Sequence, residues 1–96
     1  MYGLIGKIVA VPGKRTELTA ILAGMEAMAG CLNYVVAEDS SDTDAVWVTE
    51  VWETSEDHAA SLRMQSVQAA IAQGRPLIAA FESQVETKPV GGIGLS

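Results

Sequence analysis

The chain has 96 residues, of which 49% are hydrophobic, and its 12 acidic side chains outnumber its 6 basic ones. The formal net charge of -6, with the basic residues scattered along the chain, excludes the positive surface that nucleic acid or an anionic membrane requires. This length fits a single domain over residues 1–96, and the hydrophobic share, larger than a small soluble monomer needs, predicts a buried subunit interface or a ligand cavity.

The first two predicted elements are a strand and an amphipathic helix. Residues Tyr2–Val11 are apolar and β-branched, and the Pro12-Gly13 pair that follows predicts a turn. Apolar side chains then recur at helical spacing over Lys14–Ala29, and Gly30 is a typical residue for the end of a helix.

The second and third strands are predicted to form a hairpin. Residues Cys31–Glu38 form the second strand, and the polar stretch Asp39–Asp44 forms the turn. In the third strand Val46, Val48, Glu50 and Trp52 alternate with Trp47, Thr49, Val51 and Glu53. Each face therefore presents one indole and one carboxylate, and neither face is purely polar. We expect both faces of this strand to be covered.

The second half of the chain is predicted to begin with a helix that Thr54 or Ser55 caps and that runs to about Met64. Glu56 and Asp57 place negative charge in its first turn, where the helix dipole favours it. The remaining predicted elements are a helix capped by Ser66 and running through Ala72, a short helical piece opened by Pro76, a strand over Ser83–Lys88 and a glycine-rich tail over 89–96.

The resulting order, β-α-β-β-α-β, predicts an α+β, ferredoxin-like fold with a four-stranded antiparallel sheet. Helices cover only one face of such a sheet. Because the third strand is apolar on both faces, we expect a second copy of the chain to cover the other face. The tail is expected to fold over the pocket of its own subunit or onto the neighbouring subunit.

The composition also bears on the compartment. Cys31 is the single cysteine, so the chain can form neither an internal disulfide nor a thiolate metal cluster. The apolar N-terminal residues are interrupted by Lys7 and Pro12 and lack the pattern of a signal peptide. No stretch approaches the roughly 18 apolar residues of a spanning helix. These features predict a soluble cytoplasmic protein.

The segment Glu50–Leu62, EVWETSEDHAASL, with the element order and the length, resembles the antibiotic biosynthesis monooxygenase (ABM) domain, and the resemblance covers nearly the whole chain. It implies a homodimeric α/β barrel, in which two sheets pack together and each subunit holds a pocket between its sheet and its helices. It also implies an oxidoreductase that oxidises a quinol or polycyclic phenol with molecular oxygen, without a metal or flavin cofactor.

The chain departs from the family pattern at several positions. Many members carry a histidine nine residues after the aromatic that ends the third strand. Here that position is Ser61, and His58 lies one turn earlier. The residues with which haem-degrading members bind and attack haem fall at Gly6, Ser61 and Ile71, and none of the three matches. We therefore expect no haem.

Cofactor-free oxygenation needs a base for the substrate hydroxyl and an apolar pocket. His58 is the preferred catalytic base, because an imidazole titrates near neutral pH. A histidine near a helix start is also a common solvated surface residue. Glu50 is the alternative base if its pKa is raised by burial, or it forms a structural ion pair with Arg75 or another arginine.

Other side chains are predicted to shape the substrate pocket. Trp52 or Trp47 could stack on a flat aromatic ring or serve only as core. Of the neighbouring residues Asn33 and Tyr34, one is expected to face the pocket and donate a hydrogen bond to a substrate oxygen. The further residues expected at the substrate are Ser61, Leu62 and Phe81.

Two other functions fit the same pattern. The missing histidine at Ser61 favours a non-catalytic barrel that binds a small molecule. Alternatively, the protein catalyses an oxygen-independent isomerisation or lactone reaction on the same fold.

Overall fold

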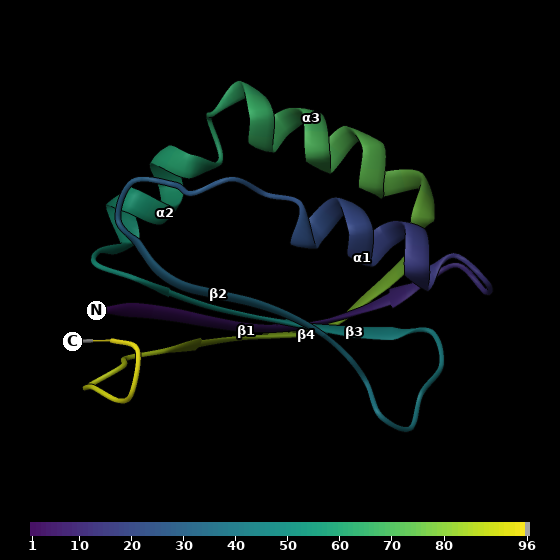
Figure 1. The fold of residues 1–96 in the computed structure, drawn as a ribbon, viewed down its shortest axis with the longest axis horizontal. Coiled ribbons are helices and arrows are strands. Elements are labelled where there is room, and N and C mark those ends of the chain that lie inside the picture. The colour runs from purple at the N-terminus through teal and green to yellow at the C-terminus, as the bar shows by residue number, and fades with distance from the viewer. Residues whose placement is uncertain (96) are drawn as a thin grey trace.

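The computed structural model describes residues 1–95, which form a four-stranded antiparallel sheet with three α-helices on one of its faces (Figure 1). The sheet order is β2-β3-β1-β4. This arrangement confirms the predicted ferredoxin-like α+β fold. The elements are β1 (Tyr2–Ala10), α1 (Arg15–Ala23), β2 (Cys31–Glu38), β3 (Ala45–Trp52), α2 (Ser55–Ser61), α3 (Gln65–Gly74), the 3-10 turn η1 (Arg75–Leu77) and β4 (Ile78–Thr87).

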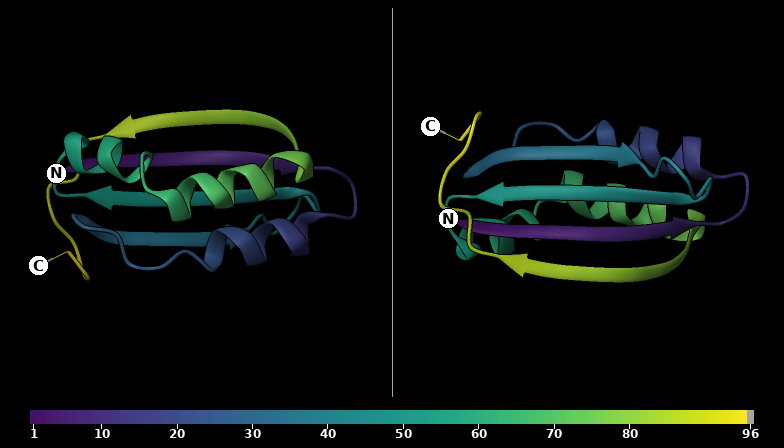
Figure 2. Two further views of the ribbon diagram at one scale, coloured as in Figure 1. Left: turned by 90° about the horizontal axis from the view of Figure 1, so that it is seen from above. Right: turned by 90° about the horizontal axis from the view of Figure 1, so that it is seen from below.

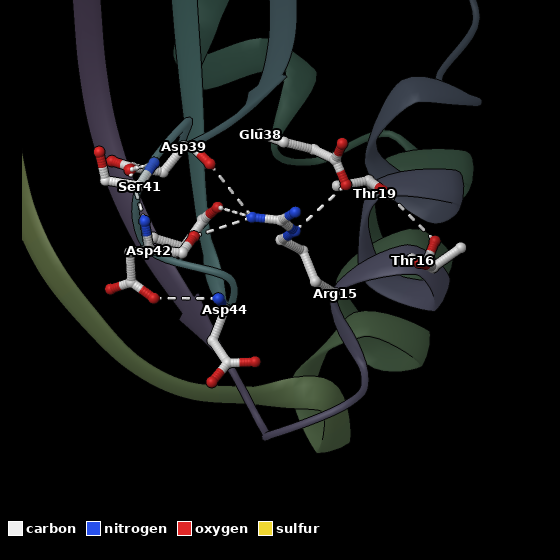
Figure 3. Close-up of polar contacts among 9 residues, drawn as sticks. Arg15, Thr16, Thr19, Glu38, Asp39, Ser41, Asp42 and Asp44 are labelled. Carbon is white, nitrogen blue, oxygen red and sulfur yellow. Dashed lines mark hydrogen bonds and ion pairs between the residues drawn. The ribbon is translucent and has the colours of Figure 1, made fainter.

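The hairpin between β2 and β3 is held by its own aspartates and by α1. Asp39 Oδ1 accepts hydrogen bonds from the backbone N–H groups of Ser41 and Asp42, at 2.8 and 2.9 Å. Arg15, the first residue of α1, donates to the Asp42 carbonyl oxygen at 2.8 Å and pairs with Glu38 at 3.1 Å (Figure 3). The predicted turn over Asp39–Asp44 is therefore confirmed.

The first helix is shorter than its apolar spacing predicts. It ends at Ala23, where the Gly24 N–H closes the last turn on the Ala20 carbonyl oxygen. Glycine is a poor helix former, and residues 25–30 instead return to the sheet as an irregular segment. The side chains of Met25 and Met28 in this segment point into an interior cavity, so their apolar character serves the cavity rather than a longer helix.

The boundaries after β3 also differ from the prediction. Thr54 caps α2 as expected, because its Oγ1 accepts a hydrogen bond from the Asp57 N–H at 3.1 Å. Helix α2 ends at Ser61, before Met64, and α3 begins at Gln65 after Met64, so Ser66 is not its cap.

The fourth strand begins five residues earlier than the sequence pattern predicts. The helical piece opened by Pro76 is only the turn η1, and β4 starts at Ile78 instead of Ser83. Ile78 is paired with Ala10 of β1. Pairing along the whole length of β1 outweighs the weak local helical preference of residues 78–82.

The two faces of the sheet differ in their cover. On the helix side the core includes Leu18, Val46 and Trp52, whose side chains are almost fully buried. On the opposite face Ile5, Val35 and Val85 are exposed, and no helix among residues 1–95 covers them (Figure 2). Strand β3 covers residues 45–52, so Glu53, the carboxylate expected on the outer face, lies just beyond the strand.

The C-terminal tail runs below the sheet, on the side opposite the helices (Figure 1). None of its described residues lines the interior cavity, so the expectation that it folds over the pocket of its own subunit is wrong. Val90 and Ile93 are almost completely exposed. The last residue of the predicted tail, Ser96, lies outside the described residues. No helix within residues 1–95 has the length and apolar character needed to cross a membrane.

Candidate active site

A cavity of about 400 Å³ lies between the helix-bearing face of the sheet and the helices. Its volume is in the range of sites that bind small organic molecules. Most of its lining is apolar, with Leu4 and Ile8 on the floor, Leu18 and Leu22 from α1, and Val67 from α3. Such a lining favours a flat, largely hydrophobic ligand.

The rim of the cavity is also apolar. Leu62, Ile71 and Phe81 line the cavity and are nevertheless exposed, Phe81 by 74%. They come from the end of α2, from α3 and from β4. Phe81 belongs to the edge strand β4 and is the most exposed of the three, so the cavity is open towards this edge of the sheet. An apolar ligand could enter here without crossing a charged ring.

A polar cluster lies at one end of the cavity, where β3 meets α2. The Trp52 Nε1–H donates a hydrogen bond to Glu50 Oε1 at 3.0 Å. The His58 ring meets the Trp52 indole edge-on, with 5.4 Å between ring centroids, and lies 5.6 Å from the Tyr2 ring. Glu50, Trp52 and His58 all line the cavity, so a carboxylate and an imidazole are available to one bound ligand.

Local sequence rules account for this cluster. Alternate residues of a strand share a face, so Glu50 and Trp52 both point towards the helices. The Thr54 cap starts α2 immediately after the strand and places His58 in the first turn and a half. Ser61 also lines the cavity, but its hydroxyl donates to the His58 carbonyl oxygen at 2.6 Å. This bond occupies the hydroxyl proton.

The environment keeps Tyr34 protonated. Burial, then the nearby Glu50 carboxylate and Cys31, raise the pKa of Tyr34 to about 12. Its phenol therefore remains a hydrogen-bond donor at neutral pH and faces the same cavity. Tyr2, beside His58, likewise has a raised pKa because of burial and the Glu86 carboxylate.

The predicted ion pair between Glu50 and an arginine is wrong. Within residues 1–95 the three ion pairs join Lys7 to Glu82, Lys14 to Glu17 and Arg15 to Glu38. Glu50 accepts its hydrogen bond from Trp52 instead. Glu50 and Trp52 are two residues apart on the same face of β3, so the Trp52 indole can reach the carboxylate directly.

The structure brings most of the predicted site residues to one cavity. Those that line it are His58, Glu50, Trp52, Tyr34, Ser61, Leu62 and Phe81. Asn33 does not, because it neighbours Tyr34 and points to the opposite face of the sheet. Trp47 also lies on that face, where its Nε1–H donates to Asp39 Oδ2 at 2.8 Å. Trp47 therefore serves the hairpin.

Sequence reasoning missed three polar residues of the cavity. Arg75 lies near the Ala10 end of β1, whereas Ser83 and Gln84 lie opposite Lys7 and Gly6 in the middle of that strand. Arg75 had been considered only as a partner for Glu50. The sequence pattern predicted a helical piece after Pro76, so it did not predict that β4 begins at Ile78 and carries Ser83 and Gln84 along the cavity. A bulge in β4 opposite Lys7 and Ile8 brings the neighbours Ser83 and Gln84 both to the cavity. Among residues 1–95, no three histidine, cysteine or acidic side chains gather as a metal site.

Comparisons with known proteins point in one direction. A sequence model of the antibiotic biosynthesis monooxygenase family matches residues 1–73. The crystal structure of a candidate antibiotic biosynthesis monooxygenase from Chloroflexus aurantiacus J-10-fl is 59% identical, with a TM-score of 0.95, and the match covers 99% of this chain and 98% of that one. No curated protein matches the chain significantly.

More distant structures share the fold. A candidate antibiotic biosynthesis monooxygenase from Deinococcus radiodurans is 22% identical, with a TM-score of 0.77, over 97% of this chain and 96% of that one. Another from Nitrosomonas europaea is 14% identical, with a TM-score of 0.83, over 95% of this chain and 100% of that one.

Proposed function

This chain belongs to the antibiotic biosynthesis monooxygenase family, and we propose that it is a cofactor-independent monooxygenase acting on a quinol or polycyclic phenol. The observation that carries the proposal is that a carboxylate and an imidazole, each in contact with Trp52, both line an apolar cavity. Such a cavity can hold a planar aromatic ligand with its hydroxyl at Glu50 and His58.

The reaction begins with removal of the substrate hydroxyl proton by His58. The electron-rich anion then gives one electron to dioxygen, and the resulting radical pair combines at a ring carbon to form a peroxide. The peroxide takes up a proton and loses water, so one oxygen atom stays on the ring as a quinone carbonyl. The carbon–hydrogen bond at that position breaks, and substrate plus dioxygen gives quinone plus water.

The surroundings favour each step. An apolar cavity lets the anion and the radical pair react away from water. Tyr34 lines the cavity, and its neutral phenol can donate a hydrogen bond to a substrate oxygen. Glu50 is the second candidate base. One of its oxygens accepts from Trp52, and the other remains available to the substrate.

We also propose that the protein is a homodimer in which two sheets pack face to face. The support is the open face of the sheet, where Ile5, Val35 and Val85 are exposed as a cluster on three strands. We propose that the exposed Val90 and Ile93 of the tail contact the neighbouring subunit. The unpaired thiol of Cys31 supports a location in the reducing cytoplasm.

One observation favours a second candidate, a barrel that binds a small molecule without turnover. Ser61, at the position where many family members carry a histidine, has its hydroxyl bonded to a backbone carbonyl. It therefore supplies no base. An oxygen-independent isomerase differs from both candidates in turning substrate over without dioxygen.

Oxygen uptake tests these alternatives. Reduced naphthoquinols, anthrones and catechols are supplied to the wild type and to the His58→Ala, Glu50→Gln and Glu56→Gln variants, with an enzyme-free control for autoxidation. Glu56→Gln is the matched control, because Glu56 is exposed and does not line the cavity. Loss of the general base is expected to slow uptake about 100-fold or more.

The outcomes separate the candidates. A large loss in His58→Ala supports the proposed base, and a loss confined to Glu50→Gln transfers that role to Glu50. Equal uptake by all four proteins and by the enzyme-free control would contradict the monooxygenase. Product formation under argon would instead favour the isomerase.

A further inference from the structure

Arg75 lies at the end of the cavity away from the Glu50 cluster, and it is the cavity's only cationic side chain among the described residues apart from a protonated His58. We propose that Arg75 selects aromatic substrates that carry a carboxylate at the end of the ring system remote from the reacting hydroxyl. This inference rests on the proposed function in taking the same cavity as the substrate site.

The sheet register separates the two polar ends. Glu50 is opposite Leu4 of β1, whereas Ile78, which follows the turn containing Arg75, is opposite Ala10. The turn is tied to the end of β1 by a hydrogen bond from the Val11 N–H to the Leu77 carbonyl oxygen at 2.8 Å. Six residues of a strand span about 20 Å. Once the lengths of the Glu50 and Arg75 side chains are subtracted, the gap suits a fused two- or three-ring aromatic.

The guanidinium of Arg75 is available to a ligand. Lys7, Lys14 and Arg15 are each paired with a carboxylate, but within residues 1–95 the Arg75 side chain forms no ion pair and donates no hydrogen bond. Ser83 and Gln84 also line the cavity, but they lie opposite Lys7 and Gly6 of β1, between its two ends, so Arg75 is the group that meets an anion at the far end. A planar guanidinium matches a carboxylate with two parallel hydrogen bonds.

The charge of the protein makes this arginine decisive. With a net charge of -6, the molecule as a whole repels an anionic ligand. Apart from His58 beside Glu50, the other polar side chains of the cavity are uncharged, and Glu50 is a carboxylate. An acid can therefore bind stably in one orientation only, with its carboxylate at Arg75 and its hydroxyl at Glu50 and His58. The same arrangement would disfavour the reverse orientation, which places two carboxylates together.

Arg75 also follows the last turn of α3, where a cation stabilises the helix dipole. That structural role does not depend on the charge of a ligand. A comparison of charged and uncharged ligands therefore separates the two roles.

The test uses calorimetric binding of 6-hydroxy-2-naphthoate and of its uncharged methyl ester at low salt and pH 6.5. The titrations are run under argon, so that binding is measured without turnover. The proteins are the wild type, Arg75→Gln and the matched control Arg63→Gln, because Arg63 is exposed and does not line the cavity. The wild type is expected to bind the acid more tightly than the ester. Arg75→Gln should weaken acid binding about tenfold and leave the ester unchanged.

An ester preference in the wild type, equal losses for both probes in Arg75→Gln, or no binding of either probe would overturn the inference. So would a loss of acid binding in Arg63→Gln as large as that in Arg75→Gln, because it would reflect overall charge. Acid-selective binding without oxygen uptake would support the role of Arg75 and contradict the monooxygenase. Equal oxygen uptake on charged and neutral quinols would support the monooxygenase and contradict the role of Arg75.

Discussion

A carboxylate in an apolar cavity is stable only if its oxygens find donors. Glu50 has one donor, the indole N–H of Trp52 at 3.0 Å, and the two side chains share a strand face because they are two residues apart. The bond orients the carboxylate towards the cavity and limits its rotation. At the residue scale, the hydrogen bond from Trp52 holds the Glu50 carboxylate where it can accept a hydrogen bond from a substrate hydroxyl.

Tyr34 gives a prediction about alkaline pH. Its pKa is raised to about 12, from an ordinary value of 10.0, so the folded state favours the neutral phenol. The corresponding stability is complete below pH 10 and is lost as the pH rises towards 12. Urea unfolding of the wild type and of Tyr34→Phe should therefore show a steeper loss of stability above pH 10 in the wild type.

The matched comparison for Tyr34 is an ultraviolet titration of phenolate absorbance. The wild type should show no tyrosine ionising at the ordinary pKa, because the pKa of Tyr2 is raised as well. A full tyrosine equivalent titrating near pH 10 in the folded wild type, absent from Tyr34→Phe, would contradict the burial argument.

At the scale of elements, α2 is the part of the site most dependent on a single side chain. It has only seven residues, Ser55–Ser61, and a helix of this length has little stability of its own. The Thr54 hydroxyl satisfies one of its free N–H groups, and Glu56 and Asp57 add favourable charge at its N-terminus. Because α2 carries His58, fraying of this helix would displace the proposed base.

Thr54→Ala is expected to lower the free energy of unfolding by about 1 kcal/mol, since an alanine at this position cannot accept the Asp57 N–H. Urea denaturation measures the change. Ser55→Ala is the control, because Ser55 is exposed and its hydroxyl bonds only the neighbouring Glu56. Equal losses in the two variants would argue against a specific cap.

At the scale of the molecule, the open face of the sheet is an apolar surface that no helix of residues 1–95 covers. Ile5, Val35 and Val85 come from β1, β2 and β4, so the exposed cluster extends across the sheet. Soluble monomers rarely leave such a surface exposed. Sheet-to-sheet association of two chains would bury it and would leave both cavities on the outer, helix-bearing sides.

We therefore expect the wild type to elute as a dimer at micromolar concentration in sizing with light scattering. Ile5→Glu should shift it to a monomer, because a carboxylate at the centre of the proposed interface would be buried without a partner. Phe81→Glu is the control, since Phe81 is even more exposed but lies on the helix side. A monomeric wild type, or equal dissociation in both variants, would contradict the proposed interface.

Local rules predicted much of the site. Strand alternation placed Glu50 and Trp52 on one face, and the cap at Thr54 placed His58 just after them. The boundaries of α1 and β4 were predicted less well. Met25 and Met28 continue a helical pattern although they serve the cavity, and residues 78–82 form a strand because β1 offers a full-length partner. Neither effect is visible in a local window of sequence.

The element order and the two-sided third strand were determined by the sequence, because hydrophobic periodicity and capping are properties of neighbouring residues. Only the tertiary structure decided that Tyr34 and not Asn33 faces the cavity, because the hairpin register sets which face each alternate residue takes. The tertiary structure also places Arg75 and Glu50 towards opposite ends of the cavity. Their separation follows from the pairing of β1 with β3 and with β4, and this pairing joins residues far apart in the chain.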